Sequence, residues 1–195
     1  MTSPVLLIIA GVNGAGKSTL DLTLEKSGHV FSNFKRINVD DIVRQQHSDW
    51  RELKAYLAAF RTAAVLFRQY VSQKQSFIWE TTLAGHPRQE IEFAKANGFK
   101  IEVRYVGLSS PDIAIRRVHK RVRLGGHGVE DSVVRTRYER SLKHLVQLSD
   151  LFDELEIIDN TNQMLETIYM YSNELKVLID ERDGYDWAKK LVFNF

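Results

Sequence analysis

The hydrophobic positions along the chain follow two alternating patterns. Short segments with the length of strands lie at 5–10, 36–39, 76–79, 100–108 and 155–158, and the first is entirely apolar. Between them, apolar residues recur at helical spacing, most clearly from Trp50 to Gln73. Strands that alternate with helices predict a parallel sheet covered by helices on both faces, with ligands beyond the carboxyl ends of the strands. We therefore expect an α/β protein with a five-stranded parallel sheet.

Glycine or proline marks an end of several of the remaining predicted helices. These helices are expected from Ser18 to near Gly28, between Pro87 and Gly98, from Pro111 to Gly125, over 131–148 and over 185–192. The segment 164–180 is rich in β-branched and aromatic residues, which favours a β-hairpin near the C-terminus.

A glycine-rich segment follows the first apolar run. Residues 11–18 fit the pattern G-x-x-x-x-G-K-[ST], between a predicted strand and a predicted helix. A bare turn is the alternative, but in this setting the backbone N–H groups and the helix N-terminus bind phosphate. We expect a nucleoside triphosphate there, with Lys17 at its β- and γ-phosphates and Ser18 on Mg²⁺. The nucleotide should contact Gly11, Val12, Asn13, Gly14, Ala15, Gly16, Lys17, Ser18 and Thr19.

Composition narrows the class of protein. A chain of 195 residues that is 44% hydrophobic and 27% charged is typical of one soluble domain. The net charge of +2 is too small to argue for a nucleic-acid or membrane partner. The absence of cysteine excludes disulfides, thiolate metal sites and a thiol nucleophile. The apolar run 5–10 is too short for a membrane span and leads into the phosphate loop, so we read it as a strand and expect a cytoplasmic protein.

Polar residues directly follow two of the predicted strands. Asp40 and Asp41 come after the second strand, and Glu80, Thr81 and Thr82 come after the third. At the carboxyl ends of parallel strands these side chains would lie near the phosphate loop. Each also has a structural alternative, since either aspartate could cap the following helix and the threonines could form a turn.

The region around Gly125 and Gly126 is unusually basic. Its positive side chains are Arg116, Arg117, Lys120, Arg121 and Arg123 before the glycines, and Arg135, Arg137 and Arg140 after them. Taken alone, this run is most simply a solvated helix surface. His127 has no neighbour at metal-ligand spacing, which favours a loop residue over a metal ligand.

Together these motifs resemble the zeta toxins and their small bacterial relatives. The resemblance is carried by residues 7–19, Asn38-x-Asp40-x-Ile42, Glu80-Thr81-Thr82-Leu83, and the stretch from Arg117 through Gly125-Gly126-His127 to Tyr138. Their order and spacing match from about Pro4 to Asn160. In one departure, Val129 is followed by Glu130, where relatives carry a proline.

The resemblance implies a single P-loop nucleotide-kinase-like domain over 1–195, with sheet order 2-3-1-4-5. It places a lid at about 117–137. The resemblance ends at about Asn160, so the C-terminal extension that we expect at about 161–195 lies outside it. The resemblance also implies an enzyme that uses ATP and Mg²⁺ to phosphorylate a hydroxyl group of a nucleotide-activated amino sugar such as UDP-N-acetylglucosamine. An antitoxin protein is the partner that this family suggests.

The same resemblance gives roles to the polar residues. Asp40 becomes the general base, with Asp41 as the other choice. Glu80 would orient a Mg²⁺-bound water or hold an acceptor hydroxyl, and Thr81 and Thr82 would line the acceptor site. These are expectations from the family pattern at matching positions.

The basic residues acquire roles as well. Arg121 and Arg135, on either side of the lid tip, would act as arginine fingers on the transferred phosphoryl group. Arg117 and Arg137 are the competing choices, and Arg116 and Arg123 are read as solvated.

Two further readings stay open beside this one. A P-loop kinase could act on another hydroxylated metabolite, an antibiotic or a polynucleotide end, because the fold does not choose the substrate. A non-catalytic nucleotide-binding regulatory protein would keep the phosphate loop but would need no general base.

Overall fold

The computed structural model describes residues 3–26, 30–46, 52–172, 175–178 and 185–192. Its strands form one seven-stranded sheet in the order β2-β3-β1-β4-β5-β6-β7. The strands are β1 (Val5–Ala10), β2 (Lys35–Ile37), β3 (Phe77–Thr81), β4 (Lys100–Gly107), β5 (Glu154–Asp159), β6 (Glu166–Ser172) and β7 (Leu175–Leu178). The first five are parallel, which confirms the predicted order 2-3-1-4-5.

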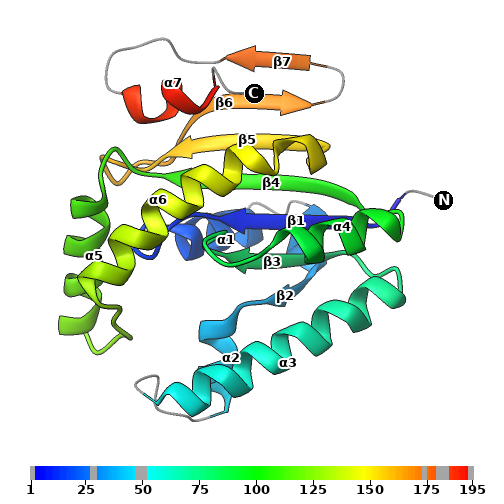
Figure 1. Ribbon diagram of the computed structural model, residues 1–195, viewed down its shortest axis with the longest axis horizontal. Helices are drawn as coiled ribbons and strands as arrows, with labels where there is room; N and C mark the ends of the chain where they lie inside the picture. The colour runs from blue at the N-terminus through cyan, green and yellow to red at the C-terminus, as the bar shows by residue number, and fades with distance from the viewer. Residues whose placement is uncertain (1–2, 27–29, 47–51, 173–174, 179–184, 193–195) are drawn as a thin grey trace.

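Helices cover both faces of the sheet (Figure 1). They are α1 (Lys17–Lys26), α2 (Val39–Gln45), α3 (Leu53–Ser72), α4 (Arg88–Ala96), α5 (Pro111–Arg123), α6 (Asp131–Gln147) and α7 (Asp186–Val192). Residues of α3, α4 and α7 and the second half of α6 join one core cluster, and residues of α1 and α5 join the other. No helix within the described ranges is long and apolar enough to cross a membrane.

The central strand β1 divides these two cores. Leu6 and Ile8 pack into one cluster, while Leu7 and Ile9 pack into the other, and all four side chains are fully buried. Burial on both faces explains why this strand is a continuous apolar run and not an alternating one. The phosphate loop leaves the carboxyl end of this strand, so it is anchored in the best-buried part of the molecule.

The second strand is shorter than the predicted run 36–39. It ends at Ile37 because Asn38 caps α2, with its Oδ1 accepting the backbone N–H of Asp40 at 2.9 Å. Asp40 therefore lies in the first turn of a helix. The capping role considered for the aspartates belongs to Asn38, which leaves the carboxylate of Asp40 for other contacts.

The third and fifth strands are longer than predicted. Glu80 and Thr81 still belong to β3, where they pair with Ile9 and Ala10 of β1. Asp159 likewise belongs to β5 and pairs with Gly107. The helix expected from Trp50 begins at Leu53 within the described residues, because 50 and 51 lie outside them.

The C-terminal extension continues the same sheet. β6 pairs antiparallel with β5, and β7 pairs antiparallel with β6, which confirms the predicted hairpin over its described residues. Figure 1 shows this hairpin and α7 at the upper edge. The ring of Trp187 on α7 packs against Gly107, where an added Cβ would lie only 1.8 Å from the ring. Its Nε1–H donates to Asp159 Oδ1 at 2.9 Å, so the extension is joined to the ends of β4 and β5.

Candidate active site

The phosphate loop is shaped by close contacts that only glycine permits. Gly11 has a φ of +138°, and a Cβ there would lie 2.2 Å from the carbonyl oxygen of Val106 on β4. Gly14 has a φ of +82° and meets the carbonyl oxygen of Ala114 on α5 in the same way. The loop is therefore seated between the sheet and α5. This geometry fits a cradle for phosphate at the start of α1.

A buried asparagine supports the loop from the end of β5. The Nδ2 of Asn160 donates to the carbonyl oxygen of Ala15 at 2.7 Å, and this amide is 6% exposed. It also fills the space beside Gly16, where a Cβ would lie 2.2 Å from the same nitrogen. The sequence predicted Asn160 only as a residue after a strand.

Lys17 and Glu80 face each other without a close ion pair. Lys17 Nζ lies 3.8 Å from Glu80 Oε1 and 3.4 Å from the carbonyl oxygen of Val12. Burial lowers the pKa of Lys17, opposed by the charges of Glu80 and Asp40. Burial raises the pKa of Glu80, opposed by Lys17. The spacing leaves the ammonium incompletely paired, and the phosphates of a nucleotide would supply the missing charge.

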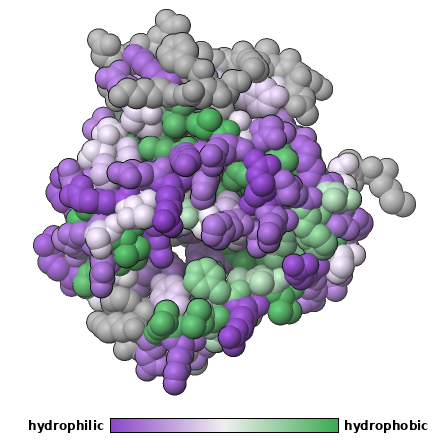
Figure 2. Space-filling model, in the orientation of Figure 1, coloured by the Kyte–Doolittle hydropathy of each residue, from purple (hydrophilic) through white to green (hydrophobic). Residues whose placement is uncertain are grey.

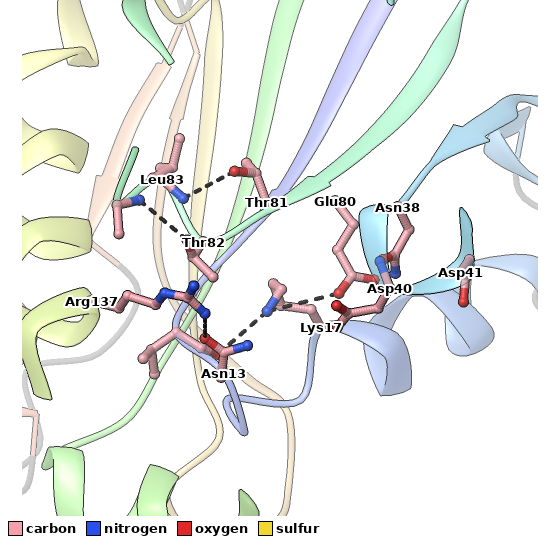
Figure 3. Close-up of polar contacts among 12 residues, drawn as sticks. Asn13, Lys17, Asn38, Asp40, Asp41, Glu80, Thr81, Thr82, Leu83 and Arg137 are labelled. Carbon is pink, nitrogen blue, oxygen red and sulfur yellow. Dashed lines mark hydrogen bonds and ion pairs between the residues drawn. The ribbon is translucent and has the colours of Figure 1, made fainter. Parts of the chain in front are cut away.

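Asp40 is held at both of its carboxylate oxygens. Tyr56 on α3 donates its hydroxyl to Oδ1 at 2.8 Å, and His127 Nε2 lies 2.7 Å from Oδ2. Burial would raise the pKa of Asp40, but the hydrogen bonds from His127 and Tyr56, together with the charge of Lys17, lower it to about 2. Figure 3 shows Asp40 beside Lys17 and Glu80, with Asp41 apart from them.

Asp41, the other choice for the base, has a different environment. Its side chain is 43% exposed and pairs with Arg44 one turn further along α2. It does not line the cavity at the phosphate loop, whereas Asp40 does. The structure thus brings Asp40, and not Asp41, to the phosphate loop.

The region predicted as a lid contains a glycine turn directly after α5. Gly125 has a φ of +84°, its N–H bonds to the carbonyl of Val122, and the N–H of Gly126 bonds to the carbonyl of Arg121. The side chain of Arg121 donates its Nε–H to the carbonyl oxygen of His127 at 2.9 Å. Its Nη2 is buried and has no hydrogen-bond partner among the described residues. The turn so places both Arg121 and His127 at the cavity.

The other arginines of the lid region differ sharply in position. Arg135 is 53% exposed and pairs with Asp112 on the outer surface, so the structure does not bring it to the phosphate loop. Arg137 instead donates to Asn13 Oδ1 within that loop at 2.8 Å. Arg117 lines the cavity but is engaged with the carbonyls of Asn160 and Thr161.

Two cavities meet at this place. The loop cavity, of about 660 Å³, is lined by the phosphate loop with Lys17, Ser18 and Thr19, and by Asp40, Tyr56, Glu80, Arg117, Arg121 and His127. The second cavity, of about 580 Å³, lies between α3, the end of β3 and α6, and its lining includes Phe60, Trp79, Glu90, Arg137 and Arg140. Arg137 joins them, because it lines the second cavity and binds Asn13 of the first. Figure 2 shows the hollow on this face, with hydrophobic side chains on its lower rim.

Thr81 and Thr82 form the turn that the sequence offered as their structural alternative. The Oγ1 of Thr81 accepts the N–H of Leu83 at 3.2 Å, and that of Thr82 accepts the N–H of Ala84 at 3.4 Å. These bonds form the turn after β3, in which Leu83 has a φ of +56°. Both threonines also line the second cavity, beside Trp79.

Tyr56 and His127 are site residues that the sequence reasoning missed. Tyr56 was read as part of the apolar stripe of a helix, and a lone hydroxyl in that stripe is a weak signal. His127 was read as a loop residue, although it stands in the Gly-Gly-His segment that carries the family resemblance. Among the described residues no three His, Asp or Glu side chains cluster as a metal site, and a Mg²⁺ shared by Ser18 and phosphates would need no such cluster.

Comparison with known proteins identifies the family. The family model described as zeta toxin matches residues 1–183. This chain belongs to the zeta toxin family. An uncharacterized protein of Haemophilus influenzae is 32% identical to it over 133 residues, which are 68% of this chain and 91% of that protein.

Solved structures show the same fold at low sequence identity. A chain from the PezAT chromosomal toxin-antitoxin system of Streptococcus pneumoniae is 14% identical, with a TM-score of 0.68 over 99% of this chain and 84% of that one. A chain of AvrRxo1-ORF1:-ORF2 with ATP is 13% identical, with a TM-score of 0.63 over 97% of this chain and 63% of that one. A putative kinase of Chloroflexus aurantiacus is 18% identical, with a TM-score of 0.56 over 71% of this chain and 78% of that one. The predicted nucleotide-kinase-like fold is thereby confirmed.

Proposed function

We propose that this zeta toxin family member is an ATP-dependent kinase that phosphorylates a hydroxyl group of a nucleotide-activated amino sugar such as UDP-N-acetylglucosamine. The observation that carries the proposal is the meeting of Lys17, Asp40 and Arg121 in one cavity built on the phosphate loop. A protein that only bound a nucleotide would need the loop and the lysine. It would not need a carboxylate fixed at both oxygens beside them.

Bound ATP, with Mg²⁺, supplies the phosphoryl group in this proposal. The loop amides and Lys17 would hold the β- and γ-phosphates, and Ser18 would help to hold the ion. Glu80, 3.8 Å from Lys17, is placed to orient water on the ion or to bind the acceptor. These residues supply positioning and charge neutralisation, which are most of what phosphoryl transfer needs.

Asp40 acts as the base and takes the proton of the acceptor hydroxyl. Arg121 supplies charge to the transferred group through its buried, unpaired Nη2. We assign the second arginine position to Arg137, because it contacts Asn13 of the phosphate loop while Arg135 points outward. Arg135 is therefore no longer our candidate.

The second cavity is our candidate acceptor site. It is linked to the loop cavity through Arg137. It offers aromatic walls at Trp79 and Phe60, hydroxyls at Thr81 and Thr82, and a positive side chain at Arg140. Aromatic faces suit the rings of a nucleotide sugar, and guanidinium suits its phosphates. The chemistry of this lining supports an anionic acceptor that carries rings.

A toxic activity would follow from consuming such a metabolite. The solved chain from Streptococcus pneumoniae comes from a toxin-antitoxin system. We extend that setting to this chain and propose an antitoxin protein as its partner. Expression of the wild type in a bacterial host should then arrest growth, and expression of Asp40→Asn should not.

The decisive experiment uses labelled ATP to measure phosphoryl transfer by variants of two neighbouring aspartates, Asp40 and Asp41. The purified protein is incubated with Mg²⁺, γ-labelled ATP and a panel of UDP-amino sugars, sugar acids, an aminoglycoside antibiotic and an oligonucleotide with a 5′-hydroxyl. Asp40→Asn should lower turnover about a hundredfold or more and leave ATP affinity nearly unchanged. Asp41→Asn is the matched control and should behave like the wild type, because Asp41 pairs with Arg44 in solvent.

Each other outcome has a definite meaning. Normal turnover in Asp40→Asn contradicts the assignment of the base. Transfer of label to a sugar acid, an antibiotic or an oligonucleotide, but not to UDP-amino sugars, keeps the kinase and replaces the acceptor.

A further inference from the structure

The tip of the lid touches the base directly. His127 Nε2 lies 2.7 Å from Asp40 Oδ2, and the histidine side chain is only 16% exposed. The loop that carries it is fixed by the glycine turn at Gly125 and by the bond from Arg121 Nε to the carbonyl of His127. The contact is therefore held by backbone geometry and not only by a flexible side chain.

With this contact in place, both oxygens of Asp40 already have a donor within hydrogen-bond distance. Tyr56 occupies Oδ1 at 2.8 Å and His127 occupies Oδ2. A hydroxyl that is to lose its proton must come within hydrogen-bond reach of one of these oxygens. Each oxygen keeps a second lone pair, but a donor already within 2.8 Å of each one crowds the approach, so an acceptor hydroxyl reaches the base most directly when one donor moves aside.

The two donors differ in how easily they can move. Tyr56 stands on the twenty-residue helix α3, next to the buried Ala55 and near the buried Ala59. His127 stands on the short loop between α5 and α6. The ring of Tyr56 packs against the core cluster, so moving it would cost buried contacts, whereas moving His127 needs only a change in the loop.

We propose that His127 is a specificity-determining residue, which occupies Asp40 Oδ2 in the absence of an acceptor, keeps water from the base, and is displaced by the acceptor hydroxyl. This inference rests on the proposed kinase function. Water is the acceptor that every kinase must reject, since it is small and always present. In this arrangement water would have to displace an imidazole that the lid holds in place, without the binding contacts of a larger acceptor in the second cavity.

The rejected reaction is hydrolysis of ATP. An O–H bond of water breaks and its proton goes to Asp40, a bond forms between the water oxygen and the γ-phosphorus, and the bond from that phosphorus to the β-bridging oxygen breaks. ADP leaves with the bonding electron pair, and inorganic phosphate is the other product. Removing the imidazole should open this path.

The test measures phosphate release from ATP and Mg²⁺ with no acceptor present. His127→Ala should raise the rate at least about tenfold, which is a modest part of what a general base contributes. The double variant His127→Ala with Asp40→Asn should lose that gain, because the released base is what activates water. His127→Gln keeps an N–H donor and should stay closer to the wild-type rate.

A second histidine provides the matched control. His119 on α5 is 53% exposed and pairs with Asp131, outside both cavities. His119→Ala should leave acceptor-free hydrolysis unchanged. A rise in both histidine variants would point to general loosening of the lid and would overturn the proposal.

Folding and ATP affinity are measured first, by thermal unfolding and calorimetry. A folded His127→Ala protein that binds ATP normally but hydrolyses it no faster than the wild type overturns the proposal. If the alanine variant does not fold, His127→Asn, whose shorter amide does not reach Asp40, takes its place with the same expectation. Because no acceptor is used, this result is separate from the acceptor panel, whose failure would instead count against the kinase assignment.

Discussion

At the scale of single residues, the charge of Asp40 is set by its two hydrogen-bond donors. Burial disfavours the carboxylate, yet the contacts of His127 and Tyr56 hold the pKa at about 2, below the ordinary value of 3.8. A group whose pKa is depressed on folding stabilises the native state above its ordinary pKa, and this stability is lost as pH falls toward the folded value. The contribution of Asp40 is therefore complete above about pH 4 to 5 and declines toward pH 2.

Removing one donor should move this titration. Tyr56→Phe deletes the hydroxyl that binds Asp40 Oδ1 and keeps the ring, so the pKa of Asp40 should rise from about 2 toward 3.8. Carbon-13 NMR of protein labelled at aspartate carboxyls measures the midpoint, and Asp40→Asn identifies the signal. Tyr70→Phe on the same helix, whose ring packs on Phe77, is the control and should leave the midpoint in place. An unchanged midpoint in Tyr56→Phe would show that His127 alone holds the charge.

The sequence predicted site residues that belong to short motifs. It did not predict residues that reach the site only when distant segments of the chain come together. The phosphate loop and Asn38-x-Asp40 are short motifs, so they could be read directly. His127 and Tyr56 reach the site from segments far apart in the chain. Arg135 and Arg137 are two positions apart on α6, which turns them to different sides of the helix by about 200°. Their separation from Gly125 and Gly126 along the sequence could not choose between them. In the structure Arg137 lies on the same side of the helix as the buried Val134, three residues before it.

At the scale of elements, the end of β5 supports the phosphate loop through Asn160. Its amide binds the carbonyl of Ala15 from a buried position. Hydrophobic periodicity predicted this strand well, but it could not show that the residue after it reaches across to the loop after β1. For the same reason, the predicted ends of β2 and β3 differ from the observed ones. The helix cap at Asn38 ends β2, and pairing with β1 extends β3.

Asn160→Ala should weaken both the fold and nucleotide binding. The carbonyl of Ala15 would lose its buried partner, at a cost of about 1–3 kcal/mol in the free energy of unfolding. The loop would also lose the contact beside Gly16. If ATP binding loses a similar free energy of about 1–3 kcal/mol, ATP affinity should fall about tenfold or more. Calorimetry and denaturant unfolding measure the two effects.

Asn97→Ala is the control that separates the loss of stability from the loss of ATP affinity. The amide of Asn97 likewise donates to a backbone carbonyl, that of Phe93, but at the end of α4 and away from both cavities. It should cost stability and leave ATP affinity alone. Equal affinity in Asn160→Ala and the wild type would mean that the loop holds its shape without this support.

At the scale of the whole molecule, the extension after Asn160 is built onto the nucleotide-binding core. The hairpin extends the sheet from β5, and Tyr185 and Leu191 near the C-terminus enter the same core cluster as Leu6 of β1. Trp187 lies against Gly107 and bonds to Asp159, next in sequence to the asparagine that supports the loop. The β-branched and aromatic content of 164–180 predicted the hairpin, and α7 was also predicted. The contact of Trp187 with Gly107 depends on a single glycine that has no local signature in the sequence. We infer that the chain unfolds as one domain.

That inference predicts one cooperative transition in which tail and core unfold together. Trp187→Phe keeps an aromatic ring over Gly107 but removes the N–H that binds Asp159, at a cost of about 1–2 kcal/mol. For a chain of this length the Tm should fall by roughly 2–8 °C. Tyr185→Phe is the comparison, because its hydroxyl binds Glu166 Oε2 at 2.5 Å entirely within the extension. In a single domain both variants lower the same transition, whether it is followed by circular dichroism or by loss of ATP binding. A separate early transition in Tyr185→Phe, with ATP binding retained beyond it, would instead make the extension an independent unit.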